Sequence, residues 1–413
     1  MLDVISPVWW NWQTRRTQNP VVAIPCGFDP RHRHQIPFSQ ENGIFYFISK
    51  ILIISPDHRL IGGRMEAQRK YNIDLLRILA CFMVVLLHVA ADNWYYVPYD
   101  SAEWMSFNFY DIATRSAVPI FFMISGAMFL SKNTFSLKKL FCRNIARLVF
   151  IYFLWSALYA VDTIGLRELL PSLSSGYFFS VVMDSKYHLW YLPELISIYF
   201  ILPLLFAVKN IENGKYLKYI LCLFFALEIL PAFMNVFPFL QEAKAVIERF
   251  VFPFPQYLGY FILGYVIYEN IDVFKRIRSA FLAIGLVVIV VSLTIINYII
   301  SVVRHVPSEM FYNSFFIASF LEACALFILF LRIPCEKIPP KIAPLIARTS
   351  KYTLFVYLLH PFVLEHLNIH FGINSLCGYP FFSVPAISLA IFMICFATAF
   401  IIDKIPFIKK IFI

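Results

Sequence analysis

Charged side chains are scarce in this chain. Only 15% of its 413 residues are Asp, Glu, Lys or Arg, whereas 60% are hydrophobic. A soluble domain carries about a quarter charged residues and about half apolar ones. The shortage of charge excludes a soluble protein and indicates an integral membrane protein. The net charge of +10 therefore predicts no nucleic-acid partner, because polytopic membrane proteins keep Lys and Arg in their cytoplasmic loops.

Paired metal-binding cysteines are also missing. The eight cysteines form no CxxC pair, and most of them lie within apolar runs. This pattern excludes a disulfide framework and indicates small buried side chains. His366 and His370 have the spacing of a metal pair, but no third ligand accompanies them at a suitable spacing. We therefore expect no bound metal.

A secretory signal peptide is lacking as well, since no basic start leads into a short apolar core. Residues 1–64 differ from the remainder. The genetic code allows Cys26–Arg31 to be TGC GGG TTC GAT CCC CGC, which contains the paired arms GCGGG and CCCGC around the loop TTCGATC of a transfer RNA T-arm. We interpret residues 1–64 as a translated transfer RNA gene and its spacer, with the true start at Met65. The alternative is a disordered cytoplasmic extension before a transmembrane domain at 65–413.

Long apolar runs fill the rest of the chain. A run of about 20 residues is long enough for a helix to cross the bilayer core. The sequence predicts an all-α integral membrane protein with about ten transmembrane helices. The predicted spans are 73–91, 109–130, 146–166, 188–208, 216–236, 252–269, 280–303, 314–333, 352–371 and 382–402.

Basic residues alternate between the loops that join these runs. One set of loops and ends holds twenty-one Lys and Arg residues, and the opposite set holds five. By the positive-inside rule, the rich set is cytoplasmic and both termini lie inside. The two halves of the chain show no convincing duplication, which counts against a repeat-built transporter.

The first span carries ionisable residues that are costly within a membrane, and such residues mark functional sites. Arg77 and His88 are eleven residues apart, so they share one helix face and are separated by about 16 Å along the axis. Arg77 is then near the cytoplasmic surface and His88 in the outer half. The structural alternative is an Arg that snorkels to the interface and a His bonded inside the bundle.

The second span combines a charge, a proline and a small-residue step. Arg115 is expected at about the depth of His88, where a buried guanidinium needs an anion or several acceptors. Pro119 is expected to bend the helix. Ser125 and Gly126 indicate either a functional role or a close contact between helices.

The fourth span opens with His188, Trp190 and Tyr191, followed by Glu194. Trp and Tyr at this position are typical of the interfacial aromatic belt. Together with an intramembrane acid, they also fit the mouth of an acceptor site, with aromatic faces for a sugar.

The ninth span contains Tyr357, Leu358, Leu359, His360 and Pro361, with His360 expected in mid-membrane.

These motifs resemble those of membrane acyltransferase family 3, and they occur in the same order along the chain. They are Arg-x10-His on span 1, Arg-x-x-Val-Pro-x-Phe-Phe-x-x-Ser-Gly on span 2, His-Leu-Trp-Tyr-Leu on span 4 and Tyr-Leu-Leu-His-Pro on span 9. The likeness covers Arg69 to Lys410. It is greatest to bacterial inner-membrane O-acetyltransferases of O-antigen, lipopolysaccharide and enterobacterial common antigen. Glu194 stands one residue before the acid of the family pattern.

The resemblance implies acetyl-CoA as acyl donor, without a permanently bound cofactor. The implied acceptor is a hydroxyl of a surface polysaccharide or of its undecaprenyl-linked precursor. The resemblance and the topology together imply His88 as general base, Arg115 as oxyanion or acceptor ligand, and Arg77 as holder of the CoA phosphates. The expected donor-site residues are Arg77, Lys139, Arg143, Arg147, Ser125 and Gly126. The expected acceptor-site residues are His188, Trp190, Tyr191, Glu194, Tyr357 and His360.

Three alternatives remain open. A secondary transporter or flippase would use the intramembrane Arg, His and Glu residues as a proton or substrate pathway. A membrane scaffold would keep the fold without catalysis. Within the enzyme class, the acyl group is acetyl or succinyl and the acceptor a hydroxyl or an amine.

Overall fold

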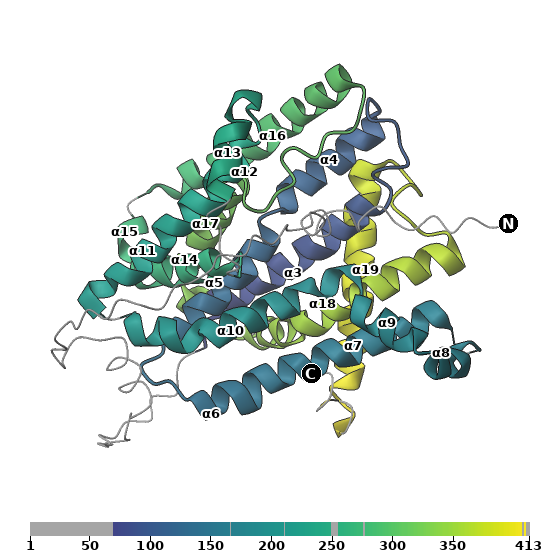
Figure 1. Ribbon diagram of the computed structural model, residues 1–413, viewed down its shortest axis with the longest axis horizontal. Coiled ribbons are helices and arrows are strands. Elements are labelled where there is room, and N and C mark those ends of the chain that lie inside the picture. Colours follow the sequence, from purple (N-terminus) through teal and green to yellow (C-terminus); the bar gives the residue numbers. More distant parts are fainter. Residues whose placement is uncertain are drawn as a thin grey trace, which may run out of the picture. The chain divides into compact units, whose positions relative to one another are not determined.

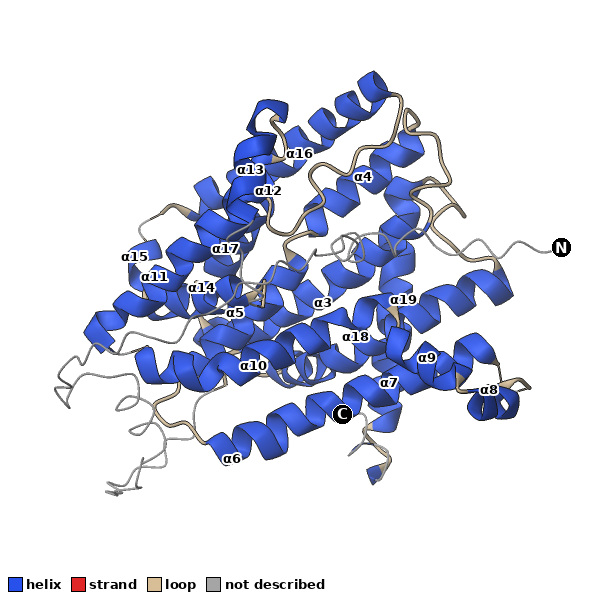
Figure 2. Ribbon diagram, in the orientation of Figure 1, coloured by secondary structure: helices blue, strands red, loops and turns tan. Residues whose placement is uncertain are grey.

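The computed structural model describes residues 69–165, 167–209, 211–248, 255–275, 277–406 and 409. The chain divides into two units after Arg69, and the described residues other than Arg69 belong to the second unit, Lys70–Ile413. The prediction for residues 1–64 lies outside the described residues. Within the described ranges every regular element is a helix (Figure 2).

Among the described residues, seven helical segments are long and apolar enough to cross a membrane. They are α3 (Tyr71–Asp92), α4–α5 (Ala102–Leu130), α6–η2–α7 (Leu137–Ile164), η3–α10 (Tyr187–Val208), α11–η5–α12 (Lys215–Met234), α16 (Ser279–Arg304) and α19 (Pro380–Ile402). The prediction of a multi-pass membrane protein is confirmed. The count of ten spans and the cytoplasmic location of both termini stay predictions.

The other three predicted runs also contain helices. Two are shorter apolar helices, α14 (Leu258–Glu269) and α17 (Ile317–Leu331). The third, α18 (Ala343–Phe371), begins nine residues before the predicted run at 352–371. The remaining elements are the short helices α8 (Leu169–Ser175), α9 (Tyr177–Asp184), η4 (Ile211–Gly214), η6 (Pro238–Leu240), α13 (Gln241–Glu248), α15 (Ile271–Phe274) and η7 (Cys335–Lys337).

Local sequence explains where the helices around the site begin and end. Ser101 caps α4 (Ala102–Thr114), since its side chain accepts a hydrogen bond from the Trp104 amide. The helix is interrupted at Arg115 and Ser116, before α5 (Ala117–Leu130) begins. Pro119 has no N–H to donate to the carbonyl of Arg115, four residues earlier, so the helix cannot run through unchanged. Gly372, with a φ of +64°, ends α18.

Helix α3 lies at the centre of the described bundle. It packs against α4, α5, α17, α18 and α19 (Figure 1). Its buried residues include Ala80, Cys81, Val89 and Ala90, which are distributed around the helix rather than along one stripe. A helix surrounded on most sides holds its polar side chains inside the protein, away from lipid.

Helices α5 and α14 approach each other very closely through two glycines. A Cβ atom on Gly126 would stand 1.7 Å from the carbonyl oxygen of Phe261. One on Gly264 would stand 2.0 Å from the carbonyl oxygen of Met123. Only the missing side chains permit this spacing, as in other small-residue contacts between membrane helices.

Asp403, directly after α19, joins the end of that helix to the start of α18. Its carboxylate accepts a hydrogen bond from the Tyr352 hydroxyl (2.7 Å) and pairs with Lys351 (2.6 Å) and Lys409 (2.9 Å). The hydrogen bonds from Lys351, Lys409 and Tyr352 hold the pKa of Asp403 well below its usual range.

We expect Asp403→Asn to lower the apparent melting temperature in detergent at pH 7. A depressed folded-state pKa contributes stability above the unfolded-state pKa of about 3.9 and loses it as the pH falls. The contribution is at most about 1 kcal/mol, because solvent screens exposed ion pairs. The difference between wild type and variant should therefore shrink below about pH 4. A difference that stays constant from pH 7 to pH 3 would contradict this role.

Candidate active site

Three histidines from three helical segments meet beside α3. The ring centroids of His88 and His360 are 5.0 Å apart, and those of His188 and His360 are 5.7 Å apart. His188 and His360 are 2% and 1% exposed, and His88 is half-buried. The sequence motifs predict a catalytic role for His88 and an acceptor role for the other two, and the structure brings all three together. Among the described residues, no group of three or more His, Cys, Asp and Glu side chains is arranged to hold a metal ion.

Pro361 explains the orientation of the His360 ring. Because Pro361 has no N–H, the Tyr357 carbonyl four residues earlier lacks its normal helical donor. Nδ1 of His360 lies 2.7 Å from that carbonyl oxygen. A carbonyl oxygen only accepts, so Nδ1 carries the proton and Nε2 of the neutral ring keeps its lone pair. This Nε2 atom is buried and has no hydrogen-bond partner among the described residues.

Aromatic rings enclose the three histidines. The Tyr187 ring lies 5.2 Å from that of His88, and the Tyr159 ring lies 5.2 Å from that of His188. The hydroxyl of Tyr357 donates to the backbone carbonyl of His188, which ties α18 to η3. No sequence motif singles out Tyr159 or Tyr187. Tyr187 precedes His188 directly, but nothing local to Tyr159 marks it.

Arg115 occupies the break between α4 and α5. Its guanidinium pairs with Asp111, one turn earlier and 2% exposed, and lies 4.8 Å from the centre of the Tyr312 ring. The sequence predicts an anion or several acceptors for this guanidinium without identifying them. The acid four residues before Arg115 was the available signal.

A buried polar network supports the Tyr312 ring. Its hydroxyl accepts from Trp94 Nε1 (3.1 Å) and donates to Asn108 Oδ1 (2.8 Å), which also accepts from Asn297 Nδ2 (2.8 Å). The network links α4 and α16 to the segment before α17. No local sequence pattern predicts this network, because its members come from distant parts of the chain.

The predicted donor residues fall into two groups. Arg77 donates to Ser350 Oγ (3.1 Å) and pairs with Asp74 (3.4 Å), so it connects α3 to α18. The Tyr191 ring packs against the rings of Phe121 and Phe122 on α5, the helix that also carries Ser125.

The second donor group comprises Lys139, Arg143 and Arg147, which are exposed on the segment Leu137–Ile164. That segment packs against α10. Gly126 lies in the contact between α5 and α14, which is the structural alternative for this residue. The donor-binding role of all these residues stays a prediction.

Two of the predicted acceptor residues, Trp190 and Glu194, face the start of α14 and not the histidine cluster. Glu194 accepts a hydrogen bond from the Tyr257 amide (2.9 Å) at the start of α14. The Trp190 ring lies 5.3 Å from the Tyr257 ring. Both residues thus contact α14, whereas His188 and Tyr357 contact His360. The structure gives Glu194 a capping role, and its acceptor role stays a prediction.

Fold and site together define a multi-pass membrane protein in which a histidine of the central helix α3 meets two buried histidines of η3 and α18. The family model described as an acyltransferase domain, that of acyltransferase family 3, matches residues 70–403. The chain therefore belongs to this family and is a membrane acyltransferase. No curated protein and no solved structure matches it. The family resemblance expected from the motifs is confirmed, while the acyl group and the acceptor remain matters for proposal.

Proposed function

We propose that this protein transfers an acetyl group from acetyl-CoA to a hydroxyl of a bacterial surface polysaccharide, of O-antigen type, or of its lipid-linked precursor. The reaction takes place in the inner membrane. One observation supports it most: His88, the histidine of the Arg-x10-His motif, contacts His360, whose free Nε2 is fixed as an acceptor. A base held in orientation by a second group is the usual arrangement for activating a nucleophile.

His88 acts as general base in this proposal. It takes the proton of the acceptor hydroxyl as the oxygen attacks the thioester carbonyl carbon. The new C–O bond forms, the C–S bond breaks, and the CoA thiolate leaves and receives the proton. An N–H of His88 directed to Nε2 of His360 would keep the other His88 nitrogen unprotonated and facing the acceptor.

Arg115 stabilises the negative charge that develops on the thioester oxygen. Its ion pair with Asp111 and its contact with the Tyr312 ring fix the guanidinium before the substrate arrives. A preorganised cation costs no reorganisation during the reaction. Asp111 also stabilises the guanidinium of Arg115 before the substrate binds, since an unpaired buried guanidinium would be strongly unfavourable.

The donor enters from the end of α3 that carries Arg77. Arg77 and the exposed basic residues of the segment Leu137–Ile164 bind the phosphates of CoA. The separation of about 16 Å between Arg77 and His88 along α3 is spanned by an extended pantetheine arm. Acetyl-CoA from the cytoplasm can then meet an acceptor displayed on the other side.

Labelled acetyl-CoA tests the proposal directly. Inverted membrane vesicles with the full chain and the glycan precursors of a native host are incubated with acetyl-labelled acetyl-CoA. We expect base-labile label in the glycan or lipid-linked glycan fraction, and much less with labelled succinyl-CoA. Empty vesicles of the same host are the control.

A transporter or flippase predicts a different result. Label would then stay in acetyl-CoA, although the vesicles contain folded protein and acceptor. Base-stable label in the same fraction would point to an amine acceptor. A preference for succinyl-CoA would correct the donor and leave the family assignment intact.

A further inference from the structure

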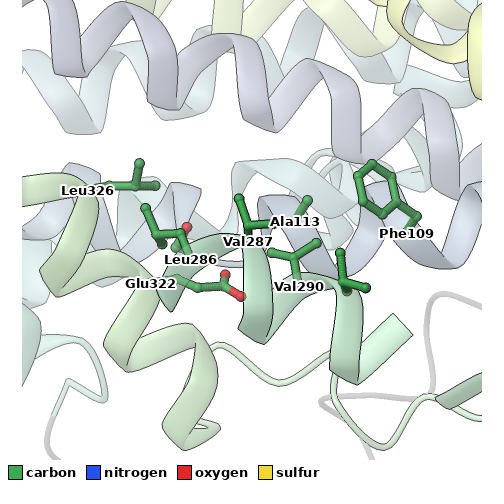
Figure 3. A pocket seen from close by; sticks show the side chains of 9 residues that line it. Phe109, Ala113, Leu286, Val287, Val290, Glu322 and Leu326 are labelled. Carbon is green, nitrogen blue, oxygen red and sulfur yellow. The ribbon is translucent and has the colours of Figure 1, made fainter. Parts of the chain in front are cut away.

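A cavity of about 330 Å³ lies outside the predicted site, between α4, the start of α5, α16 and α17. This volume is at the lower end of the about 300–1,000 Å³ that is usual for small-molecule sites. Figure 3 shows Leu326 and Phe109 at opposite ends of the cavity, with Leu286, Val287 and Val290 of α16 between them. The lining is almost wholly apolar.

Two buried oxygens in this lining lack hydrogen-bond partners. They are Oε2 of Glu322, a residue that is 2% exposed, and Oγ of Ser116, a residue that is fully buried. Neither has a partner among the described residues. In Figure 3 the carboxyl of Glu322 extends towards the α16 side chains. Native proteins rarely leave buried polar atoms unpaired, so an occupant with a hydrogen-bonding group is indicated.

The cavity borders the lipid-facing side of α16. Val287 and Val291 line it and are 63% and 43% exposed. Further along α16, Ile284, Val288 and Ile295 are exposed too. A membrane helix with such an exposed apolar face contacts lipid, so an occupant enters from the bilayer.

The lining restricts what can bind. A charged headgroup finds no Lys or Arg among the lining residues. One water at the Glu322 carboxyl would leave most of the volume empty. A bare hydrocarbon would fill the space but leave this carboxyl oxygen unpaired. An aliphatic chain with an uncharged hydroxyl satisfies both requirements.

We propose that this cavity binds one long-chain alcohol from the bilayer, with its uncharged hydroxyl at the carboxyl of Glu322. The site is distinct from the histidine cluster, although Ser116 follows Arg115 at the same helix break. Binding here does not depend on the proposed acetyl transfer.

Photolabelling tests the proposal without any acyl donor. The purified full chain in phosphatidylglycerol nanodiscs is exposed to a diazirine-bearing long-chain alcohol or to a diazirine-bearing hydrocarbon of equal length. Peptide mass spectrometry then locates the adducts. We expect the alcohol to label α16 and α17 at the cavity, about fivefold more than the hydrocarbon does, the effect of one ordinary hydrogen bond.

Matched variants assign the label to the cavity. Glu322→Leu should abolish the preference for the alcohol, whereas Glu322→Gln keeps a hydrogen-bonding group and should retain it. Val287→Trp, at the rim, should reduce labelling, and Val288→Trp, at an exposed neighbour that does not line the cavity, should not. Equal labelling by both probes, or equal labelling along all of α16, would show bulk lipid contact and overturn the proposal.

Discussion

His88→Ala is expected to lower acetyl transfer by at least about 100-fold while the protein still folds, because a positioned general base contributes about 10²- to 10⁴-fold. His88 is half-buried, so removing its ring perturbs packing less than removing a core aromatic would. The measurement is base-labile acetate on surface polysaccharide, determined by mass spectrometry in cells that express the variant at the wild-type level. Full transfer activity in a well-expressed variant would exclude the general-base role.

His360 offers a companion test, because two residues that act as one unit lose activity together. His360→Ala should lower transfer strongly, and the double variant should be hardly worse than His88→Ala. Pro361→Ala is the milder probe. It restores a backbone N–H that competes with Nδ1 of His360 for the Tyr357 carbonyl, and so it loosens the ring. Additive losses from His88 and His360 would show that the two rings act separately.

Gly126→Ala is expected to destabilise the protein by about 1–3 kcal/mol or more, the effect of overpacking a tight interior. The new Cβ would stand 1.7 Å from the Phe261 carbonyl oxygen, and that atom belongs to the backbone of α14. The helices must therefore separate. The apparent melting temperature in detergent and the yield of monodisperse protein measure the effect.

Gly285→Ala is the matched control, since nothing lies within 4 Å of its added Cβ on α16. Alanine is the better helix former by up to about 1 kcal/mol, so this variant should be as stable as wild type or more stable. Gly126→Ala with the melting temperature of Gly285→Ala would show that the close helix contact is unimportant. Normal stability with lost acetyl transfer would instead support the donor-binding role predicted for Gly126.

The contact between His88 and His360 shows what local sequence cannot predict. The spacing of Arg77 and His88 on one face of α3 follows from helix geometry, which is the same in every α-helix. His360 is far away in the chain and meets His88 only because α18 packs against α3. No local propensity encodes such a contact.

Span 4 shows that residues close together in sequence can face different parts of the structure. His188, Trp190 and Glu194 are close in sequence, so the sequence predicts one acceptor site that contains all three. Successive helical residues point about 100° apart, and neighbours in sequence can therefore face different helices. In the structure His188 faces His360, while Trp190 and Glu194 face the start of α14.

The sequence by itself determined that this is a multi-pass helical membrane protein and an acyltransferase of family 3. The thickness of the bilayer sets the length of each apolar run. The family motifs are short and occur in order along the chain. Only the tertiary structure decided which polar groups meet: Arg115 with Asp111 and Tyr312, His88 with His360, and Gly126 with the backbone of α14. The physical reason is that an apolar helix is specified by its own residues, whereas the partner of each buried polar group depends on how the helices pack.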